Sequence, residues 1–586
     1  MMRRNFAIII AVCITMTTFS IGSVSAFAEV DYDSQAIARG YVARIGEAED
    51  AYDGGSFSGY YKFLDSTYSV GYTPEYDAAF DFVDNYDVIT LIADVDMRAK
   101  SGYSQIGKNG VTLQGAEGRD ITLYRLGNFL CDGQVLTIKN LNVSLEKDNA
   151  CFASVKNGGV LTVENCTLFS KGKLESGLIQ MLGGNLDVKD SSVFLGEYDS
   201  EADTYGGIEV SGSRSDRASL VYASAKTTVT LDGVFADLTN SPDLQGIFLE
   251  KGGTVDLTDT VIKTVDNCIS LSGKSSSSVF VKGNSYIRSE GGNAISAVGC
   301  TGAFSLSMNG DSKLFGALNA LDVSDVNNVF SSVDISLSDK CSVEVGDDNG
   351  TAFLIGEHKA TVSLKDEVCV RASIPFGITQ SNKQSVFTVA DTVNVAGGGE
   401  VVAPKMQQGA SVRILEGANG IRFCASVRVE KIAKAKDHGI LLVKYGDLKS
   451  CDLTVYEMDK KGITYAKISA IDDNGSGVEQ GEDGTLSFKV VLKDIPESEI
   501  STKFAVRAYA VYDMGGVDVY VYSDFDAESN ARSMANVAYA ALGDTKPQKS
   551  DEYKYEVETG VWSPYTKEQY QTIKRTYGDL AEPIGA

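Results

Sequence analysis

The stretch GGVLTVENCTLF, at Gly158–Phe169, contains the pattern that decides the fold. Its centre, LTVEN, alternates apolar and polar residues and ends on an asparagine. The same five-residue pattern occurs at Leu136–Asn140, Leu161–Asn165, Leu186–Asp190, Val229–Gly233, Val255–Asp259, Val279–Gly283, Leu306–Gly310, Ile335–Asp339 and Val362–Asp366. Successive units begin 25, 25, 43, 26, 24, 27, 29 and 27 residues apart. A period in the twenties indicates a solenoid, in which repeats bury their apolar side chains by stacking on one another.

The alternation inside each unit predicts a β-strand with one buried face. In LTVEN, Leu161 and Val163 are expected in the core, and Thr162 and Glu164 in solvent. The fifth residue of every unit is Asn, Asp or Gly, the residue types that best tolerate a positive φ. We therefore expect the chain to turn sharply after each of these strands.

A second pattern supports the same coils. The segments NCISL, NAISA and NALDV begin at Asn267, Asn293 and Asn319, in steps of 26 residues. These asparagines are expected to stack in adjacent coils and to pass amide hydrogen bonds along the axis. Four further segments are assigned to the same strand position: Gly177–Met181, Gly206–Val210, Gly246–Glu250 and Ala352–Gly356. No helix-period segment of the length a crossover needs lies between the strands, so a flat parallel sheet with helical crossovers is not expected.

With these coils and turn residues, the chain resembles the right-handed parallel β-helix proteins of the pectate-lyase-like superfold over roughly residues 86–400. The resemblance implies a rod of stacked coils, with enzymes of the group acting from outward side chains on one sheet. Their catalytic motifs are missing from the repeat, and the His-Gly pair, His438-Gly439, lies beyond it. Because the ends of such a rod expose strand edges, a capping helix is predicted over Thr73–Val88.

After residue 410 the period is lost and longer strands follow. They are predicted at Ile421–Val429, Gly439–Gly446, Asp452–Met458, Leu486–Leu492, Phe504–Tyr512 and Val517–Ser523. A helix is expected over Ala527–Leu542, and a short one near Lys567–Tyr577. This pattern predicts a smaller antiparallel β-sandwich-like domain with a terminal helix. The region is similar to an accessory module of Gram-positive surface proteins.

The predicted organisation is therefore all-β, with five parts. They are a signal peptide (1–28), a helical capping region (29–85), a parallel β-helix (86–405), a β-sandwich-like accessory domain (410–545) and a polar tail (546–586). The first part has a basic start, an apolar run and Ala26-Phe27-Ala28, which is typical of secretion. The protein is thus expected to be secreted, extracellular or cell-surface associated. No later apolar run is long enough to predict a membrane span.

The net charge limits the classes of partner, and the cysteine pattern limits the disulfides and metal sites that can be expected. The net charge is −26, from 79 acidic and 53 basic residues, which argues against nucleic acid and anionic lipid. Cys13 lies in the predicted signal peptide, and the other nine cysteines form no CxxC motif. We interpret most of them as buried small hydrophobic residues, with a Cys424–Cys451 disulfide left as an alternative. With two histidines in the chain, no zinc cluster is predicted.

The 43-residue step contains an insertion, Gly196–Lys226. Long loops on rigid scaffolds often bind ligands, so this insertion is the best candidate region for function. Its tyrosines are suited to stack on sugar rings and its charged groups to bond hydroxyls. The candidate binding residues are Tyr198, Asp203, Tyr205, Glu209, Arg214 and Arg217. A solvated loop without a ligand is the alternative. No cofactor is expected; calcium at Asp472–Asp483 is considered, but the loop lacks the usual ligand spacing.

The favoured function is a non-catalytic secreted or cell-surface protein that binds a polysaccharide or cell-surface glycan, or acts in adhesion. One alternative is a polysaccharide lyase or glycoside hydrolase with its site near residues 196–226. A second is a structural spacer. Catalysis is disfavoured because the outward acids assigned to one sheet, Glu209 and Asp322, lie three or more coils apart, too far for paired carboxylates. The oligomeric state is left open.

Overall fold

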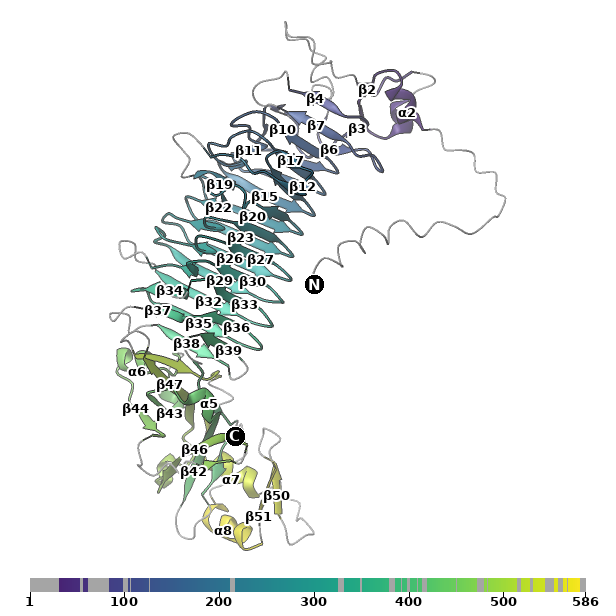
Figure 1. Ribbon diagram of the computed structural model, residues 1–586. Helices are drawn as coiled ribbons and strands as arrows, with labels where there is room; N and C mark the ends of the chain where they lie inside the picture. The colour runs from purple at the N-terminus through teal and green to yellow at the C-terminus, as the bar shows by residue number, and fades with distance from the viewer. Residues whose placement is uncertain are drawn as a thin grey trace.

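The computed structural model describes most of the chain between residues 31 and 579. The described ranges are 31–52, 56–61, 84–98, 104–105, 107–125, 127–210, 217–324, 331–347, 350–378, 385–390, 393–397, 401–407, 409–413, 419–448, 451–471, 479–481, 483–513, 518–526, 531–542, 553–556, 562–565 and 567–579. The predicted signal peptide therefore lies outside them. The strands stack like rungs along a gently curved rod, which the C-terminal region continues (Figure 1).

Each coil of the solenoid contributes a strand to three parallel sheets. Sheet 1 contains β3 (Val88–Leu91), β6 (Val111–Gly115), β9 (Val135–Lys139), β12 (Gly159–Glu164), β15 (Gly184–Lys189), β20 (Thr227–Asp232), β23 (Gly253–Thr258), β26 (Ser277–Lys282), β29 (Ala303–Met308), β32 (Ser332–Leu337), β35 (Ala360–Leu364) and β38 (Val386–Val389). Sheet 2 contains β4 (Val95–Met97), β7 (Thr122–Arg125), β10 (Asn142–Leu145), β13 (Thr167–Ser170), β16 (Ser192–Leu195), β21 (Phe235–Asp237), β24 (Val261–Thr264), β27 (Tyr286–Ser289), β30 (Lys313–Gly316), β33 (Ser342–Val345), β36 (Cys369–Ala372) and β39 (Asn394–Gly397). Sheet 3 contains β5 (Ser104–Gln105), β8 (Phe129–Asp132), β11 (Ala153–Lys156), β14 (Ile179–Met181), β19 (Ser219–Ala223), β22 (Gln245–Leu249), β25 (Ile269–Leu271), β28 (Ile295–Ser296), β31 (Asn319–Asp322), β34 (Thr351–Gly356) and β37 (Ile374–Ile378).

The predicted units lie on sheet 1 and stack in register. Leu161 lies opposite Leu136 on one side and Leu186 on the other. The column continues through Val229, Val255, Val279, Leu306, Ile335 and Val362. Leu161 and Val163 are fully buried, as the alternation predicts. The parallel solenoid is therefore confirmed over the repeat.

The sharp turn after each sheet-1 strand is also confirmed. All nine predicted turn residues have a positive φ, between 44° at Asp190 and 71° at Gly310. In one corner, Nδ2 of Asn165 donates a hydrogen bond to Oδ1 of Asn140 in the preceding rung, at 2.9 Å. Because the left-handed conformation is costly for most side chains, Asn, Asp and Gly at this position fix the corner between sheets 1 and 2.

The second asparagine series stacks as predicted. Nδ2 of Asn319 donates to Oδ1 of Asn293 at 3.0 Å, and the backbone N–H of Asn293 donates to Oδ1 of Asn267 at 2.9 Å. The ladder thus alternates amide-to-amide and backbone-to-amide bonds. It joins successive rungs just before strands β25 and β28 and at the first residue of β31.

The nine cysteines within the described residues are free, and six of them are buried. The core placement predicted for most of them is confirmed. The alternative Cys424–Cys451 disulfide is wrong, because both residues are free thiols. The rod therefore gains its cohesion from rung stacking rather than from cross-links.

The N-terminal end of sheet 1 is closed by an antiparallel pair. Strand β1 (Ala43–Ile45) pairs with β3 and with β2 (Tyr60–Tyr61). Helices α2 (Tyr32–Ile37) and α3 (Ala48–Ala51) lie next to these strands in the chain. The capping helix predicted over Thr73–Val88 falls mostly outside the described residues, and Val88 itself begins β3.

The C-terminal region carries antiparallel strands, as predicted, in two sheets. One contains β40 (Lys405–Met406), β41 (Ser411–Val412), β42 (Gly420–Arg428), β45 (Glu479–Gln480) and β46 (Thr485–Lys493); the other contains β43 (Asp437–Lys444), β44 (Tyr465–Ser469), β47 (Phe504–Asp513), β48 (Asp518–Tyr522) and β49 (Ala531–Arg532). The remaining elements are α5 (Val429–Ile432), α6 (Val455–Lys461), α7 (Met534–Leu542), β50 (Tyr553–Glu556), β51 (Trp562–Tyr565), α8 (Lys567–Tyr577) and the 3₁₀ turns Tyr445–Asp447 and Glu497–Glu499.

Two sequence predictions in this region need correction. The segment predicted as a strand at Asp452–Met458 forms α6, because Thr454 caps its N-terminus by accepting the Glu457 N–H at 3.2 Å and Gly462 ends it in the left-handed region. The helix predicted over Ala527–Leu542 is shorter, since strand β49 precedes it and α7 begins at Met534. The short helix near the C-terminus is present as α8.

The C-terminal region is joined to the solenoid by strand pairing. Strand β48 adds to the last sheet-1 rung in parallel, with Phe387 opposite Val521. Tyr512, Val519 and Val521 belong to the same buried apolar cluster as the solenoid core. The hydroxyl of Tyr512 donates to the carbonyl oxygen of Val402 at 2.8 Å. The open edge of sheet 1 is therefore covered at this end too.

Candidate functional site

The insertion leaves the solenoid after β16 and returns at β19. Its first part forms a short antiparallel hairpin, β17 (Tyr198–Asp199) and β18 (Thr204–Tyr205). The strand predicted at Gly206–Val210 does not enter sheet 3: Val210 makes an isolated bridge with Leu174, and β19 pairs with β14 instead. The strand of this coil in sheet 3 is therefore Ser219–Ala223 instead of Gly206–Val210.

The hairpin folds back over the outward face of sheet 2. The ring of Tyr205 stacks on Phe194 at a centroid distance of 4.7 Å, and Phe194 lies 5.7 Å from Phe169 in the preceding rung. Tyr198 lies 5.2 Å from Tyr205, and Phe235 lies 6.4 Å from Phe194. We call these five residues the aromatic platform. Tyr198 is 52% and Phe235 is 38% exposed, so solvent reaches both margins.

Three of the predicted site residues come together on this hairpin. Tyr198 and Tyr205 face each other across it, and the hydroxyl of Tyr198 donates to Oδ1 of Asp203 at 2.7 Å. This hydrogen bond, with the charge of the same carboxylate, raises the pKa of Tyr198. The phenol is therefore held as a neutral donor at the tip of the platform.

The other predicted residues lie elsewhere. Glu209 forms an ion pair with Lys173, and Arg214 lies outside the described residues. Arg217 lies beside sheet 3, where its Nη2 donates to Oε1 of Glu250 at 3.2 Å. Tyr222 donates to the other oxygen of that carboxylate at 2.6 Å. Arg217 and Tyr222 thus each hold one oxygen of the Glu250 carboxylate, and this cluster lies apart from the platform.

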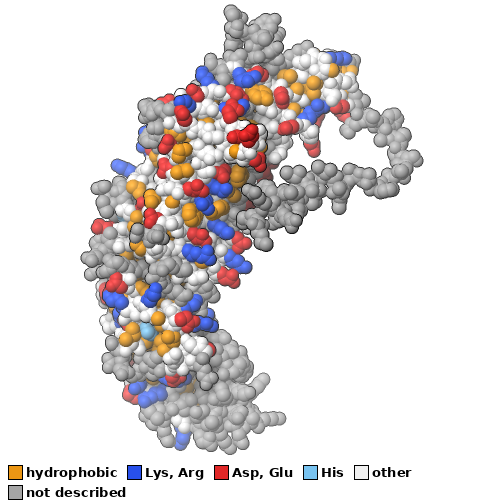
Figure 2. Space-filling view, in the orientation of Figure 1, with side chains coloured by type: hydrophobic (Ala, Val, Ile, Leu, Met, Phe, Trp, Pro, Cys, Tyr) orange, Lys and Arg blue, Asp and Glu red, His pale blue; other side chains and the backbone are white. Residues whose placement is uncertain are grey.

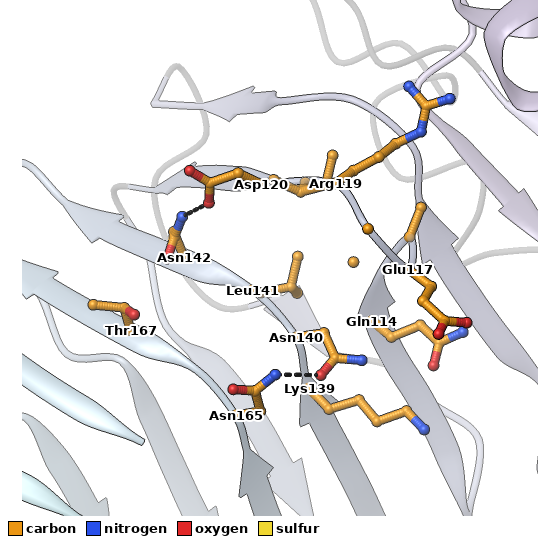
Figure 3. Close-up of a pocket in the computed structure, with 14 residues that line it drawn as sticks. Gln114, Glu117, Arg119, Asp120, Lys139, Asn140, Leu141, Asn142, Asn165 and Thr167 are labelled. Carbon is orange, nitrogen blue, oxygen red and sulfur yellow. Dashed lines mark hydrogen bonds between the residues drawn. The ribbon is translucent and has the colours of Figure 1, made fainter. Parts of the chain in front are cut away.

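A polar groove of about 720 Å³ lies toward the N-terminal end of the rod, at the corner between sheets 1 and 2 (Figure 3). We call it the amide groove. Its lining comes from the connection between β6 and β7, the turn between β9 and β10, and the turn between β12 and β13: Gln114–Ile121, Lys139–Asn142, Asn165 and Thr167. Nδ2 of Asn142 donates to Oδ1 of Asp120 across it.

One wall of the amide groove is held in place by residues at the start of helix α2. Nη2 of Arg119 donates to Oδ2 of Asp31 at 3.2 Å and to Oγ of Ser34 at 2.9 Å. Gly115, at the end of β6, has to be glycine, because a Cβ there would lie 2.1 Å from the carbonyl oxygen of Asn140 and would clash with it. The groove is therefore held in shape by backbone packing and by contacts 85 or more residues away in sequence.

Charge around the platform is mainly acidic. Glu197, Asp199, Glu201 and Asp203 lie on or beside the hairpin, and Lys171 lies 3.5 Å from both Glu146 and Glu197. Along the visible face of the solenoid, acidic and basic side chains are intermingled (Figure 2). A ligand at the platform therefore meets an apolar surface with an acidic rim.

Among the described residues, no group of three or more His, Cys, Asp or Glu side chains is placed to hold a metal ion. The calcium loop considered at Asp472–Asp483 lies mostly outside the described residues. Within the part of the chain that the structure describes, no helix is long and apolar enough to span a bilayer.

The sequence reasoning missed the amide groove and three members of the platform. Phe169 and Phe194 end the two similar stretches at Gly158–Phe169 and Gly183–Phe194, so the recurring phenylalanine at an outward position was a usable signal. The groove had no such signal, because its lining comes from three separate coils.

The fold and these surfaces define a parallel β-solenoid protein whose sheet-1 edges are covered at both ends and whose sheet-2 face carries a candidate ligand site. Comparisons of the chain with protein-family models, with curated proteins and with solved structures each found no match.

Proposed function

We propose that this protein binds carbohydrate through the aromatic platform and does not change it covalently. The observation that carries the proposal is the stack of Phe169, Phe194 and Tyr205 on an outward face, with centroid distances of 5.7 and 4.7 Å. These rings lie on the opposite face of sheet 2 from the core. Grouped aromatic rings reached by solvent suit the apolar faces of sugars, and neighbouring polar groups suit their hydroxyls.

The proposed setting is extracellular, and the partner is a polysaccharide or a cell-surface glycan. The N-terminal segment Met1–Ala28 supports secretion. The coil period and the Asn, Asp or Gly corners support a right-handed β-helix of the pectate-lyase-like kind. The similarity of the C-terminal region to an accessory module of Gram-positive surface proteins supports a place on such a surface. In that setting a rod that holds a glycan-binding face away from its attachment point would act in adhesion.

A glycan array followed by titration calorimetry tests the proposal. We expect the wild type to bind at least one class of glycan, and Tyr205→Ala and Phe235→Ala each to weaken that binding about tenfold, because an aromatic contact contributes about 0.5–1.5 kcal/mol beyond its buried area. Phe280→Ala is the matched control, since Phe280 is an outward aromatic residue on sheet 1. A blank array would favour the structural spacer instead.

A turnover assay separates binding from catalysis. Incubation with pectins, other polysaccharides and mucins is expected to release neither new reducing ends nor unsaturated uronides. Release of either product would contradict the proposal and favour the lyase or hydrolase alternative.

A further inference from the structure

The aromatic platform and the amide groove lie on the same face of the rod and are joined by a straight row of side chains. Asn142 lines the groove and lies opposite Thr167 in the next rung. Thr167 lies opposite Ser192, and Ser192 lies opposite Phe235 of the platform. We call these four residues the axial column. Neighbouring strands are about 4.8 Å apart, so its three steps span roughly 14 Å along the rod axis.

The platform borders the axial column at two of its rungs. Phe169 follows Thr167 by two residues on β13, and Phe194 follows Ser192 by two residues on β16. Residues two apart on a strand share a face and lie about 6.6 Å from each other. Each of these two rungs therefore presents one hydroxyl beside one phenyl ring, which is a pairing suited to a sugar ring with both an apolar face and hydroxyl groups.

The hydroxyls of this column are available to a ligand. Neither the Thr167 nor the Ser192 hydroxyl forms a hydrogen bond within the described structure, and both residues are partly exposed. Asn142 uses its amide Nδ2 toward Asp120, at the margin of the groove, which leaves its Oδ1 as the acceptor. Asn142, Thr167 and Ser192 thus offer uncharged donors and acceptors at the spacing of successive rungs.

We propose that the platform, the axial column and the amide groove form one continuous site for a single linear, uncharged oligosaccharide chain lying along the rod axis. The inference rests on the carbohydrate binding proposed above. The length follows from the roughly 14 Å column, which is longer than one monosaccharide. The preference for an uncharged chain follows from the column's neutral side chains and from the carboxylates of Glu197, Asp199 and Asp203 beside the platform, which repel a polyanionic chain.

The test is a length series measured by titration calorimetry on the full chain. The probes are cello-, xylo-, manno- and chito-oligosaccharides of two to six units, with oligogalacturonates of the same lengths as charged counterparts. We expect affinity for at least one uncharged series to rise with length up to about four units and then level off. Oligogalacturonates are expected to bind at least tenfold more weakly than uncharged chains of equal length.

A double variant that removes both column hydroxyls with little change in side-chain shape tests whether the ligand contacts the axial column. Thr167→Val with Ser192→Ala is expected to weaken binding of the six-unit chain about tenfold, because two hydrogen bonds are lost, and to leave binding of the two-unit chain within twofold. Thr230→Val is the matched control, since Thr230 is an outward, partly exposed threonine on sheet 1. The thermal unfolding midpoint of each variant confirms that it folds.

The possible results separate this inference from the proposed function. If two-unit and six-unit chains bind equally well, the site is the platform alone and the extended site is wrong. If oligogalacturonates bind as tightly as uncharged chains, the charge preference is wrong. If the column variant binds the long chain normally, the chain does not follow the column. If no probe of either kind binds, while Tyr205→Ala and wild type behave alike on the array, the carbohydrate proposal itself fails.

Discussion

Nη2 of Arg507, in the C-terminal region, donates a hydrogen bond of 2.9 Å to Oγ1 of Thr388, in the last rung of sheet 1. The same guanidinium donates to the Ser523 carbonyl oxygen at 2.8 Å and lies 3.1 Å from a carboxylate oxygen of Asp452. Arg507 is 2% exposed and Ser523 is also buried, whereas the Asp452 side chain is 48% exposed. One buried side chain therefore ties the solenoid to the region that covers its edge.

Arg507→Met should lower the stability of the C-terminal junction by about 2 kcal/mol, because it removes charge-assisted hydrogen bonds and leaves the carbonyl oxygen of the buried Ser523 without this donor. The measurement is the urea unfolding midpoint of the full chain. Arg371→Met is the control: its ion pair with Glu344 is exposed and is expected to contribute less than about 1 kcal/mol. Equal midpoints for the two variants would show that Arg507 does not hold the junction.

Removing residues 401–586 should turn the rod into an associating species. The deletion takes away β48, exposes the edge of β38 and uncovers core residues now packed against Val521. Exposed strand edges with apolar neighbours pair with other chains. Light scattering after size-exclusion chromatography should show dimers or larger assemblies, whereas removal of residues 580–586 should not change the mass. A monodisperse monomer after the larger deletion would contradict the capping role.

Asn165→Ala should destabilise the solenoid by about 1–2 kcal/mol. The residue has a φ of 50°, a conformation that costs alanine this much, and its side chain bonds Asn140 in the preceding rung. Asn165→Gly should cost less, because glycine adopts this φ freely. Asn185→Ala, at an exposed position on β15, is the control. Denaturation experiments should show the largest loss of stability for Asn165→Ala, a smaller loss for Asn165→Gly and the smallest for Asn185→Ala. If Asn165→Gly loses as much stability as Asn165→Ala, the turn conformation is not the reason.

Acidification should weaken the C-terminal region through His438. This imidazole is buried against Phe488, and burial lowers its pKa, an effect that the charge of Asp437 only partly opposes. The unfolded state therefore binds the proton more readily, so the stability contributed by His438 is present above its unfolded pKa of about 6.5 and is lost as pH falls through the folded value. His438→Leu should flatten the fall in unfolding midpoint between pH 7.5 and 5.5. If the unfolding midpoint of His438→Leu falls with pH as steeply as that of the wild type, other titrating groups cause the pH dependence.

The sequence predicted the rungs well because alternation and turn residues are local and repeat. Leu161, Val163 and Asn165 behave as one unit whose neighbours constrain it in the same way in every coil. The strand predicted at Asp452–Met458 failed because its alternation competed with a stronger local signal, Thr454 followed by Glu457 three residues later, which begins a helix.

The candidate site was predictable only in part. Tyr198, Asp203 and Tyr205 could be chosen because they lie close together in an insertion. Their partner Phe235 comes from a different coil, and its place beside Phe194 depends on how the insertion returns to sheet 3 at β19 rather than at Gly206–Val210. The register after an insertion is set by packing, which a local pattern does not contain.

Register also determines how the rod would respond to force. Hydrogen bonds between rungs run along the rod axis, as between Leu136, Leu161 and Leu186, so a pull on the two ends loads them one rung after another rather than all together. Each rung that opens would release about 25 residues of chain, which extend to roughly 80 Å. A rod of this kind would therefore lengthen in steps under tension instead of breaking at a single force.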